Sequence, residues 1–488
     1  MRLIAHRLVY AGLFGLISIN MASGADSERL MDQPGTDFAA RRRELIKIVK
    51  EAEAKRPNLA AMMRGVEGAR KDGGGTGLAS EPIIVLLGEP GGVEGKFRQE
   101  NDFAYLTGVD VPDAALILSA DGGATLYLPP RNPVSERWNG KVIGPGDETA
   151  KLLGFSKVES TELFLADLFR AVSDPRKRTR RAKPMSLYMV APEGRAGTPA
   201  KESEFVKFVR QGAPNTPVRD VATLIHTLRP IKTEAEVALL RKAIAITGDA
   251  QAEVIKTITP GIPEYVLEGA ILGAFTKGGS ERLGFPSIVG SGPNSCIMHY
   301  MANRRTIEDG DLVVVDIGAE FLNYTADITR TYPANGKFTP RQSEIYQLVL
   351  DAQTGAADQF KLGETSQPIL HRWVKAFFKA SPVRAKDSEG VEQTMDHFFT
   401  HGLGHALGMD VHDVGDSSQA CKPGEVFTIE PGLYIPSESL GVRIEDDYLV
   451  KSDGTLEKLS KAIPSDRETI ERLIAEAHLS ATKAVSRP

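Results

Sequence analysis

Two aspartates interrupt an otherwise apolar, β-prone stretch, LVVVDIGAEFLNYTADITRT, which runs from Leu312 to Thr331. Asp316 follows three valines of the kind that form a buried strand, and Asp327 lies in a second β-prone run after a connection that contains Gly and Asn. A β-hairpin would bring the two carboxylates together in an apolar site, where they repel each other unless a cation lies between them. On these residues alone, a metal site and a salt-bridged or capping aspartate pair are both open.

The whole chain is long enough for more than one hydrophobic core. It has 488 residues, of which 41% are hydrophobic and 25% charged, as in ordinary soluble proteins. The formal net charge of −5 gives no electrostatic basis for binding nucleic acid. Helical and strand-like runs alternate, which indicates an α/β (α+β) fold. Pro230 and a capping-box signal at Thr233 predict a boundary between one domain at 36–228 and a second at 232–488.

The first 25 residues have the order of a secretory signal peptide. Arg2, His6 and Arg7 precede an apolar run of about a dozen residues, and small residues follow as far as Ala25. This run is shorter than the roughly 20 residues that a membrane-spanning helix needs. We therefore expect residues 1–25 to be cleaved, and the mature protein to be periplasmic or secreted with no stable membrane span. An uncleaved membrane anchor is the alternative.

Histidines and further carboxylates gather downstream of the two aspartates. Four of the nine histidines fall within DHFFTHGLGHALGMDVHDVGD, whose glycines favour a loop or strand edge over a helix. The apolar runs VFTIE and VRIE end at Glu430 and Glu445, much as the valine run ends at Asp316. Each carboxylate alone is more often an edge residue paired with arginine or water. Together with Asp327 they would carry four negative charges, which two divalent cations would balance, and one neutral imidazole would complete the set.

These motifs also carry a family resemblance. VVVDIGAEFLNYTADITRTYP, HGLGHALGMDVHD, TIEPGLY and GVRIEDD resemble motifs of the pita-bread metallopeptidases, and within them those of the Xaa-Pro aminopeptidases and prolidases. FRQENDFAYLTGVDVPDAALIL and SERWNGKVIGPGDETAKLLGF are similar to the accessory domain of aminopeptidase P. The resemblance implies two divalent metal ions, with Mn²⁺ preferred and Zn²⁺, Co²⁺ or Fe²⁺ as alternatives. Their implied ligands are Asp316, Asp327, His405, Glu430 and Glu445, with Asp327 and Glu445 bridging the metals.

The resemblance further implies a fold and a mechanism. The expected fold is a small α/β N-terminal domain followed by a pita-bread catalytic domain with a pseudo-symmetric antiparallel sheet. A hydroxide that bridges the metals would attack the first peptide bond, and Glu430 would carry its proton to the departing proline nitrogen. His299 and His412 would stabilise the oxyanion. His401 would hold the proline side, and Arg443 matches an arginine beside the last ligand.

The implied activity is release of the N-terminal residue from peptides with proline in the second position, by a homodimer or homotetramer. A prolidase has the same ligands but accepts only Xaa-Pro dipeptides, and this alternative is open. Methionine aminopeptidases lack the N-terminal domain. A non-catalytic peptide-binding protein of the same fold is a third alternative, but such relatives typically lose metal ligands. All five implied ligands are present here, which favours an enzyme.

Overall fold

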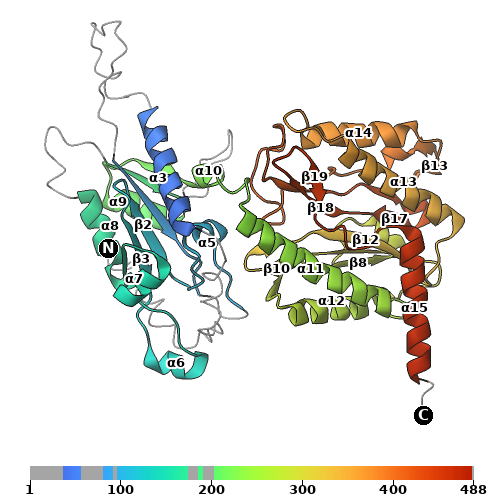
Figure 1. Ribbon diagram of the computed structural model, residues 1–488, viewed down its shortest axis with the longest axis horizontal. Coiled ribbons are helices and arrows are strands. Elements are labelled where there is room, and N and C mark those ends of the chain that lie inside the picture. Colours follow the sequence, from blue (N-terminus) through green and yellow to red (C-terminus); the bar gives the residue numbers. More distant parts are fainter. Residues whose placement is uncertain (1–36, 56–80, 92–95, 174–184, 191–202, 486–488) are drawn as a thin grey trace, which may run out of the picture. The chain divides into compact units, whose positions relative to one another are not determined.

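The computed structural model describes residues 37–55, 81–91, 96–173, 185–190 and 203–485 (Figure 1). The chain divides into two compact units, with the division between Leu228 and Arg229. The predicted signal peptide, residues 1–25, lies outside the described residues. No helix in the described ranges is both long and apolar enough to cross a membrane.

The N-terminal unit is built on one mixed sheet of six strands in the order β4-β3-β2-β1-β5-β6. The strands are β1 (Glu81–Leu87), β2 (Ala115–Ser119), β3 (Ala124–Leu128), β4 (Lys157–Ser160), β5 (Met185–Met189) and β6 (Val218–Asp220). The helices are α3 (Phe38–Ala54), α5 (Asn101–Thr107), α6 (Pro133–Asn139), α7 (Asp147–Leu153), α8 (Thr161–Ser173), α9 (Glu204–Gly212) and α10 (Ala222–Ile225). β2 pairs antiparallel with β1 and β3, whereas β5 runs parallel to β1 and β6. The α/β character predicted for this domain is confirmed.

Alternation along β1 explains how the N-terminal sheet is covered. Ile83 and Val85 point to the same face because side chains on a strand alternate. They belong to the buried cluster that includes Phe164 and Leu168 of α8 and Val209 of α9. Helix α3 packs on the opposite face of the sheet, where it contacts β1 and β2.

The C-terminal unit surrounds short antiparallel strands with long helices (Figure 1). The helices are α11 (Glu234–Thr257), α12 (Glu264–Gly278), α13 (Pro340–Asp358), α14 (Gln367–Ala380) and α15 (Arg467–Val485). The strands are β7 (Arg282–Leu283), β8 (Ile288–Ser291), β9 (Leu312–Ile317), β10 (Ala319–Phe321), β11 (Tyr324–Thr325), β12 (Ile328–Pro333), β13 (Arg384–Lys386), β14 (Glu392–Thr394), β15 (Val426–Ile429), β16 (Gly432–Ile435), β17 (Leu440–Arg443), β18 (Asp446–Val450) and β19 (Leu456–Lys458). Every strand pair described in this unit is antiparallel.

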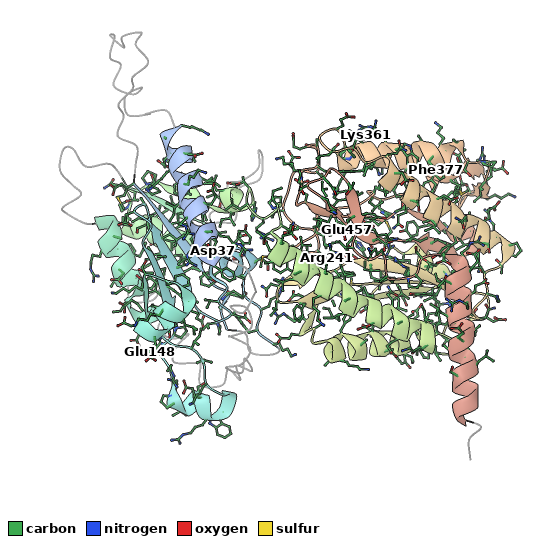
Figure 2. The ribbon with its side chains drawn as sticks, viewed as in Figure 1. Asp37, Glu148, Arg241, Lys361, Phe377 and Glu457 are labelled. Atoms are coloured by element: carbon green, nitrogen blue, oxygen red, sulfur yellow. The ribbon has the colours of Figure 1, made fainter. Side chains whose placement is uncertain are left out.

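Helix α11 begins where the sequence predicts it. Thr233 accepts the backbone N–H of Glu236, and the Glu236 carboxylate accepts the backbone N–H of Thr233, so the predicted capping box is present. Figure 2 shows Arg241 of α11 beside Glu457 of β19, and Arg241 Nη2 lies 2.9 Å from Glu457 Oε1. The helix is therefore capped at its start and joined by an ion pair to β19.

The predicted hairpin between the two aspartates is confirmed, with one addition. β9 and β12 pair antiparallel, and Ile317 lies opposite Ile328. The connection between them forms its own small hairpin from β10 and β11. Leu322 and Asn323 turn this inner hairpin with φ of 49° and 65°, which is the left-handed pair that a tight two-residue turn requires. Asp327 is consequently returned to the end of β9 that carries Asp316.

Two buried glutamines show the pseudo-symmetry of the C-terminal unit. Gln251 of α11 donates its amide N–H groups to the carbonyls of Val315 and Ile328, at 3.3 and 3.1 Å. Gln353 of α13 does the same to the carbonyls of Ile429 and Ile444, at 3.0 and 3.1 Å. In each half, a helix amide thus binds two backbone carbonyls, and each carbonyl belongs to a residue next to one of the four acidic residues. The same device fixes the backbone on both sides of the expected site.

Candidate metal centre

The four carboxylates lie where strands of the two halves begin or end. Asp316 lies near the end of β9, and Asp327 directly precedes β12. Glu430 directly follows β15, and Glu445 lies between β17 and β18. The Glu445 backbone N–H donates to the carbonyl of Thr329 at 3.1 Å, which joins the two halves. All four carboxylates line one cavity of about 620 Å³.

The histidine-rich segment is a loop, as its glycines predict. The His405 carbonyl accepts the N–H of Thr428 at 2.9 Å, so the loop runs beside β15. Gly404 is required at this crossing, because a Cβ there would overlap the Thr428 carbonyl. His405 Nε2 lies 3.4 Å from Asp327 Oδ2, 3.7 Å from Glu430 Oε1 and 3.9 Å from Glu445 Oε1.

A buried chain of polar groups leads away from Asp316. Its Oδ2 accepts a hydrogen bond from Arg443 Nη2 at 2.6 Å, and Arg443 Nη1 donates to the Tyr434 hydroxyl at 2.8 Å. The same hydroxyl lies 2.9 Å from His401 Nε2. Sequence reasoning missed Tyr434. The sequence feature that could have identified Tyr434 is its hydroxyl group, which stands in the otherwise apolar strand that follows Glu430.

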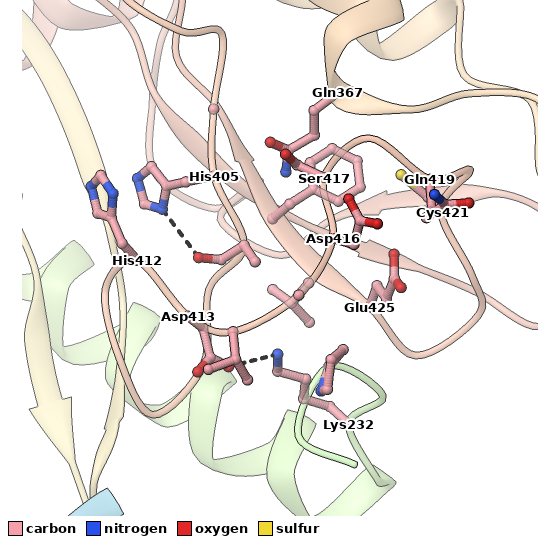
Figure 3. Close-up of a pocket in the computed structure, with 17 residues that line it drawn as sticks. Lys232, Gln367, His405, His412, Asp413, Asp416, Ser417, Gln419, Cys421 and Glu425 are labelled. Atoms are coloured by element: carbon pink, nitrogen blue, oxygen red, sulfur yellow. Dashed lines mark hydrogen bonds and ion pairs between the residues drawn. The ribbon is translucent and has the colours of Figure 1, made fainter. Parts of the chain in front are cut away.

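Two further histidines stand at the rim of the cavity. His299 and His412 are both exposed, and the His412 ring stacks on His405 with centroids 3.9 Å apart and planes 11° apart. Figure 3 shows the two rings side by side among the residues that line a smaller pocket, where Lys232 Nζ donates to Asp413 Oδ2 at 2.9 Å. This ion pair anchors the loop that carries His412.

The structure brings all nine predicted site residues to one cavity. They are His299, Asp316, Asp327, His401, His405, His412, Glu430, Arg443 and Glu445. None of the nine lies elsewhere in the fold.

Comparison with known proteins places this cavity in a family. Residues 238–452 match metallopeptidase family M24, and residues 80–179 match the aminopeptidase P N-terminal domain. Over 408 residues the chain is 33% identical to an Xaa-Pro aminopeptidase of Escherichia coli, with 78% of this chain and 90% of the relative covered. The chain belongs to metallopeptidase family M24.

Other known proteins also match this chain in sequence and in structure. The M24 chain is 31% identical to Xaa-Pro aminopeptidase 3 of Homo sapiens, over 82% of each protein. The solved structure of Escherichia coli aminopeptidase P with the inhibitor Pro-Leu matches with a TM-score of 0.73 and 28% identity, over 90% of this chain and 98% of that chain. A zinc-substituted form of the same enzyme with product matches with a TM-score of 0.72 and 28% identity, over the same shares. The two-domain fold expected from the sequence, with a pita-bread catalytic domain, is confirmed, and the protein is a metallopeptidase that uses divalent metal ions.

The pKa values of the carboxylates explain why the cavity that they line needs cations. Burial, Glu445 and Asp316 raise the pKa of Asp327 well above its usual range, and burial, Glu430 and Asp316 do the same to the pKa of Glu445. Burial and the charge of Asp316 raise the pKa of Glu430 to about 8, although Arg443 acts in the opposite direction. In the described chain, Oδ1 of Asp316 and Oδ1 of Asp327 are buried without a hydrogen-bond partner. Buried carboxylates in such a group are stable as anions only with positive charge between them.

The donors fit the divalent metal that the family implies. One ligand atom from each of Asp327, His405 and Glu445 lies within 4.8 Å of the other two, close enough to share one cation. Burial and the charge of His412 lower the pKa of His405 to about 4, so its imidazole is neutral at pH 7, as a metal ligand must be. Its Nδ1 lies 3.1 Å from the carbonyl of Ala406, which leaves Nε2 directed at the carboxylates.

Proposed function

We propose that this metallopeptidase is an Xaa-Pro aminopeptidase, which releases the N-terminal residue from peptides with proline in the second position. The observation that carries the proposal is a group of four carboxylates around one neutral imidazole, of which three are buried and Glu430 is partly buried. Two divalent cations would balance their four negative charges. We assign these cations as a pair, with Mn²⁺ preferred. The proposed ligands are Asp316, Asp327, His405, Glu430 and Glu445, with Asp327 and Glu445 shared. The aminopeptidase P N-terminal domain and the named relatives support the choice of substrate.

The chain's own residues supply proton transfer and orientation. When bound, the cations would lower the pKa of a water molecule and polarise the scissile carbonyl. Glu430 lines the cavity within 3.7 Å of His405 and 3.6 Å of His401. In this position it accepts the proton of the attacking water and delivers it to the departing proline nitrogen. Arg443 fixes the orientation of Asp316 through the 2.6 Å hydrogen bond.

The histidines divide the remaining tasks. His299 and His412 stand at the rim and donate to the oxyanion that develops on the carbonyl, a contribution of about 2.7–4 kcal/mol per donor in other enzymes. His401 is oriented by the Tyr434 hydroxyl and holds the proline side of the substrate. Proline makes the scissile bond a tertiary amide, and this enzyme class exists because ordinary peptidases cleave such bonds poorly.

Cleavage of matched short peptides tests the activity. We expect metal-loaded protein to release the first residue from an Xaa-Pro-Yaa tripeptide, and a chelator to stop this release. The Xaa-Pro dipeptide, assayed in parallel, is the comparison. Activity confined to the dipeptide would replace the proposal with a prolidase, and no hydrolysis of either peptide would favour a peptide-binding protein.

We also propose that the protein is exported and loses residues 1–25. The order of basic, apolar and small residues in this segment supports export. We expect mass spectrometry of protein recovered from the exported fraction to find an N-terminus after Ala25. An intact Met1 in that fraction would show an uncleaved anchor instead. Light scattering of the mature protein tests the proposed homodimer or homotetramer.

A further inference from the structure

A second groove adjoins the metal cavity. It has a volume of about 690 Å³ and shares His401, Gly402 and Gly404 with the cavity. Its walls come from α14, from the 3₁₀ helix η4 (Met395–His397) and from the loop that begins at Phe399. We call it the α14 groove. A peptide bound at the metal centre has this groove as one continuation of its path.

The α14 groove is lined by basic groups and by no acidic side chain. Lys375 and His371 lie four residues apart on α14, which places them on one face of the helix, and His397 of η4 lies on the wall as well. In the described part of the chain, the partly buried Lys375 ammonium has no hydrogen-bond or ion-pair partner, whereas the buried Lys232 is paired with Asp413. A half-buried cation without a partner favours an anionic ligand.

A row of three rings leads from His371, which lies one helical turn from Lys375, to His401 of the metal cavity. The Phe399 ring lies 5.2 Å from His371 and 5.1 Å from His401, centroid to centroid. Roughly three residues of extended peptide, at about 3.3 Å each, would cover the row. Burial and the charges of Lys375 and Arg372 lower the pKa of His371, so this imidazole is neutral at pH 7. Its Nδ1 is buried without a partner, which leaves Nε2 as the nitrogen that can donate to a ligand in the groove.

We propose that the α14 groove binds a carboxylate of the peptide substrate, through the Lys375 ammonium and the His371 N–H. This inference rests on the proposed function, because it concerns the part of the peptide that follows proline. The chemistry fits the C-terminal carboxylate of peptides of about four residues, and also an acidic side chain at the same distance from proline. The substrate class is therefore short peptides that carry a negative charge two to three residues beyond the scissile bond.

The test compares a free acid with its amide. For metal-loaded wild type, we expect kcat/KM for Ala-Pro-Ala-Ala to exceed that for its C-terminal amide by on the order of tenfold, the usual scale of one charge-assisted contact. In Lys375→Met this ratio should fall to near one. Lys379→Met is the matched control, because Lys379 is exposed on the same helix and does not line the groove, and it should keep the wild-type ratio.

A third peptide separates the two sources of the carboxylate. If amidated Ala-Pro-Ala-Glu regains the advantage in wild type but not in Lys375→Met, the groove binds side-chain carboxylates as well. A wild-type ratio of one, or an equal loss of the ratio in Lys375→Met and Lys379→Met, would overturn the inference. If acid and amide are hydrolysed equally, the groove proposal fails but the proposed function stands. If no Xaa-Pro peptide is cleaved, the proposed function itself is contradicted.

Discussion

We expect the Asp327→Asn variant to lose peptidase activity by about 10³-fold or more while keeping its fold. Asp327 is the acidic residue closest to His405, at 3.4 Å, and it belongs to the group whose ligand atoms lie within 4.8 Å of each other. Asparagine keeps the volume of the side chain but removes one of the four charges that would hold the proposed pair of cations. Hydrolysis of an Xaa-Pro-Yaa tripeptide, together with the metal content of the purified variant, measures the effect.

Thermal stability shows whether the Asp327→Asn variant loses activity because its chemistry fails or because it unfolds. Because burial and neighbouring carboxylates raise the pKa of Asp327, the charged side chain destabilises the metal-free protein. Metal-free Asp327→Asn should therefore melt no lower than metal-free wild type. Asp351→Asn, at an exposed position on α13, should retain both activity and metal. Full activity of Asp327→Asn at normal metal content would contradict the assignment of a dinuclear centre.

Much of the site was predictable because the signals are local. Three consecutive valines before Asp316 and the run before Glu430 predict buried strands. An acidic residue at the end of one such strand is more often paired with arginine or water, but several of them beside a histidine-rich segment favour a shared metal site. The glycines around His405 favour a loop over a helix, and the structure shows that Gly404 is required by a close backbone crossing. The hairpin that joins Asp316 to Asp327 follows from two β-prone runs with a polar connection.

The supporting residues were not predictable, because their partners are distant in sequence. Gln251 and Gln353 resemble ordinary polar residues of amphipathic helices, yet each binds two carbonyls 64 to 91 residues away. The Tyr434 hydroxyl joins Arg443 to His401 across three separate segments. No local pattern encodes such contacts, because they depend on how elements that are separate in the sequence pack together. The carboxylates can thus be named from sequence, whereas the groups that orient them require the structure.

Cation binding should stabilise the protein more at pH 8 than at pH 6.5. In the metal-free protein, the pKa values of Asp327, Glu430 and Glu445 lie above their usual values, and that of Glu430 lies at about 8. The folded state therefore holds protons that the unfolded state has released. The free energy of unfolding is highest below the unfolded pKa of these groups, near 4, and falls as the pH rises to about 8.

The histidines act in the opposite direction, but at lower pH. The pKa values of His401 and His405 are lowered from 6.5 to about 4, mainly by burial, so their contribution to the free energy of unfolding rises with pH and is complete above about 6.5. Between pH 6.5 and 8 the change in the free energy of unfolding therefore reports on the carboxylates and not on these histidines. A divalent cation removes their repulsion and should abolish the loss of stability across this interval.

Thermal unfolding with and without Mn²⁺ at the two pH values measures this difference. At a cation concentration 100 times Kd, binding to one site adds about 2.7 kcal/mol, which raises Tm by about 5–10 °C for a domain of this size. We expect Tm of the chelated protein to fall from pH 6.5 to pH 8, while Tm of the Mn²⁺-loaded protein stays nearly constant. In Asp327→Asn both the fall and the cation effect should shrink, because one of the mutually repelling carboxylates is gone. A chelated wild type that melts at the same temperature at both pH values would show that these carboxylates are neutralised within the protein itself, and the electrostatic argument for a cation pair would then fail.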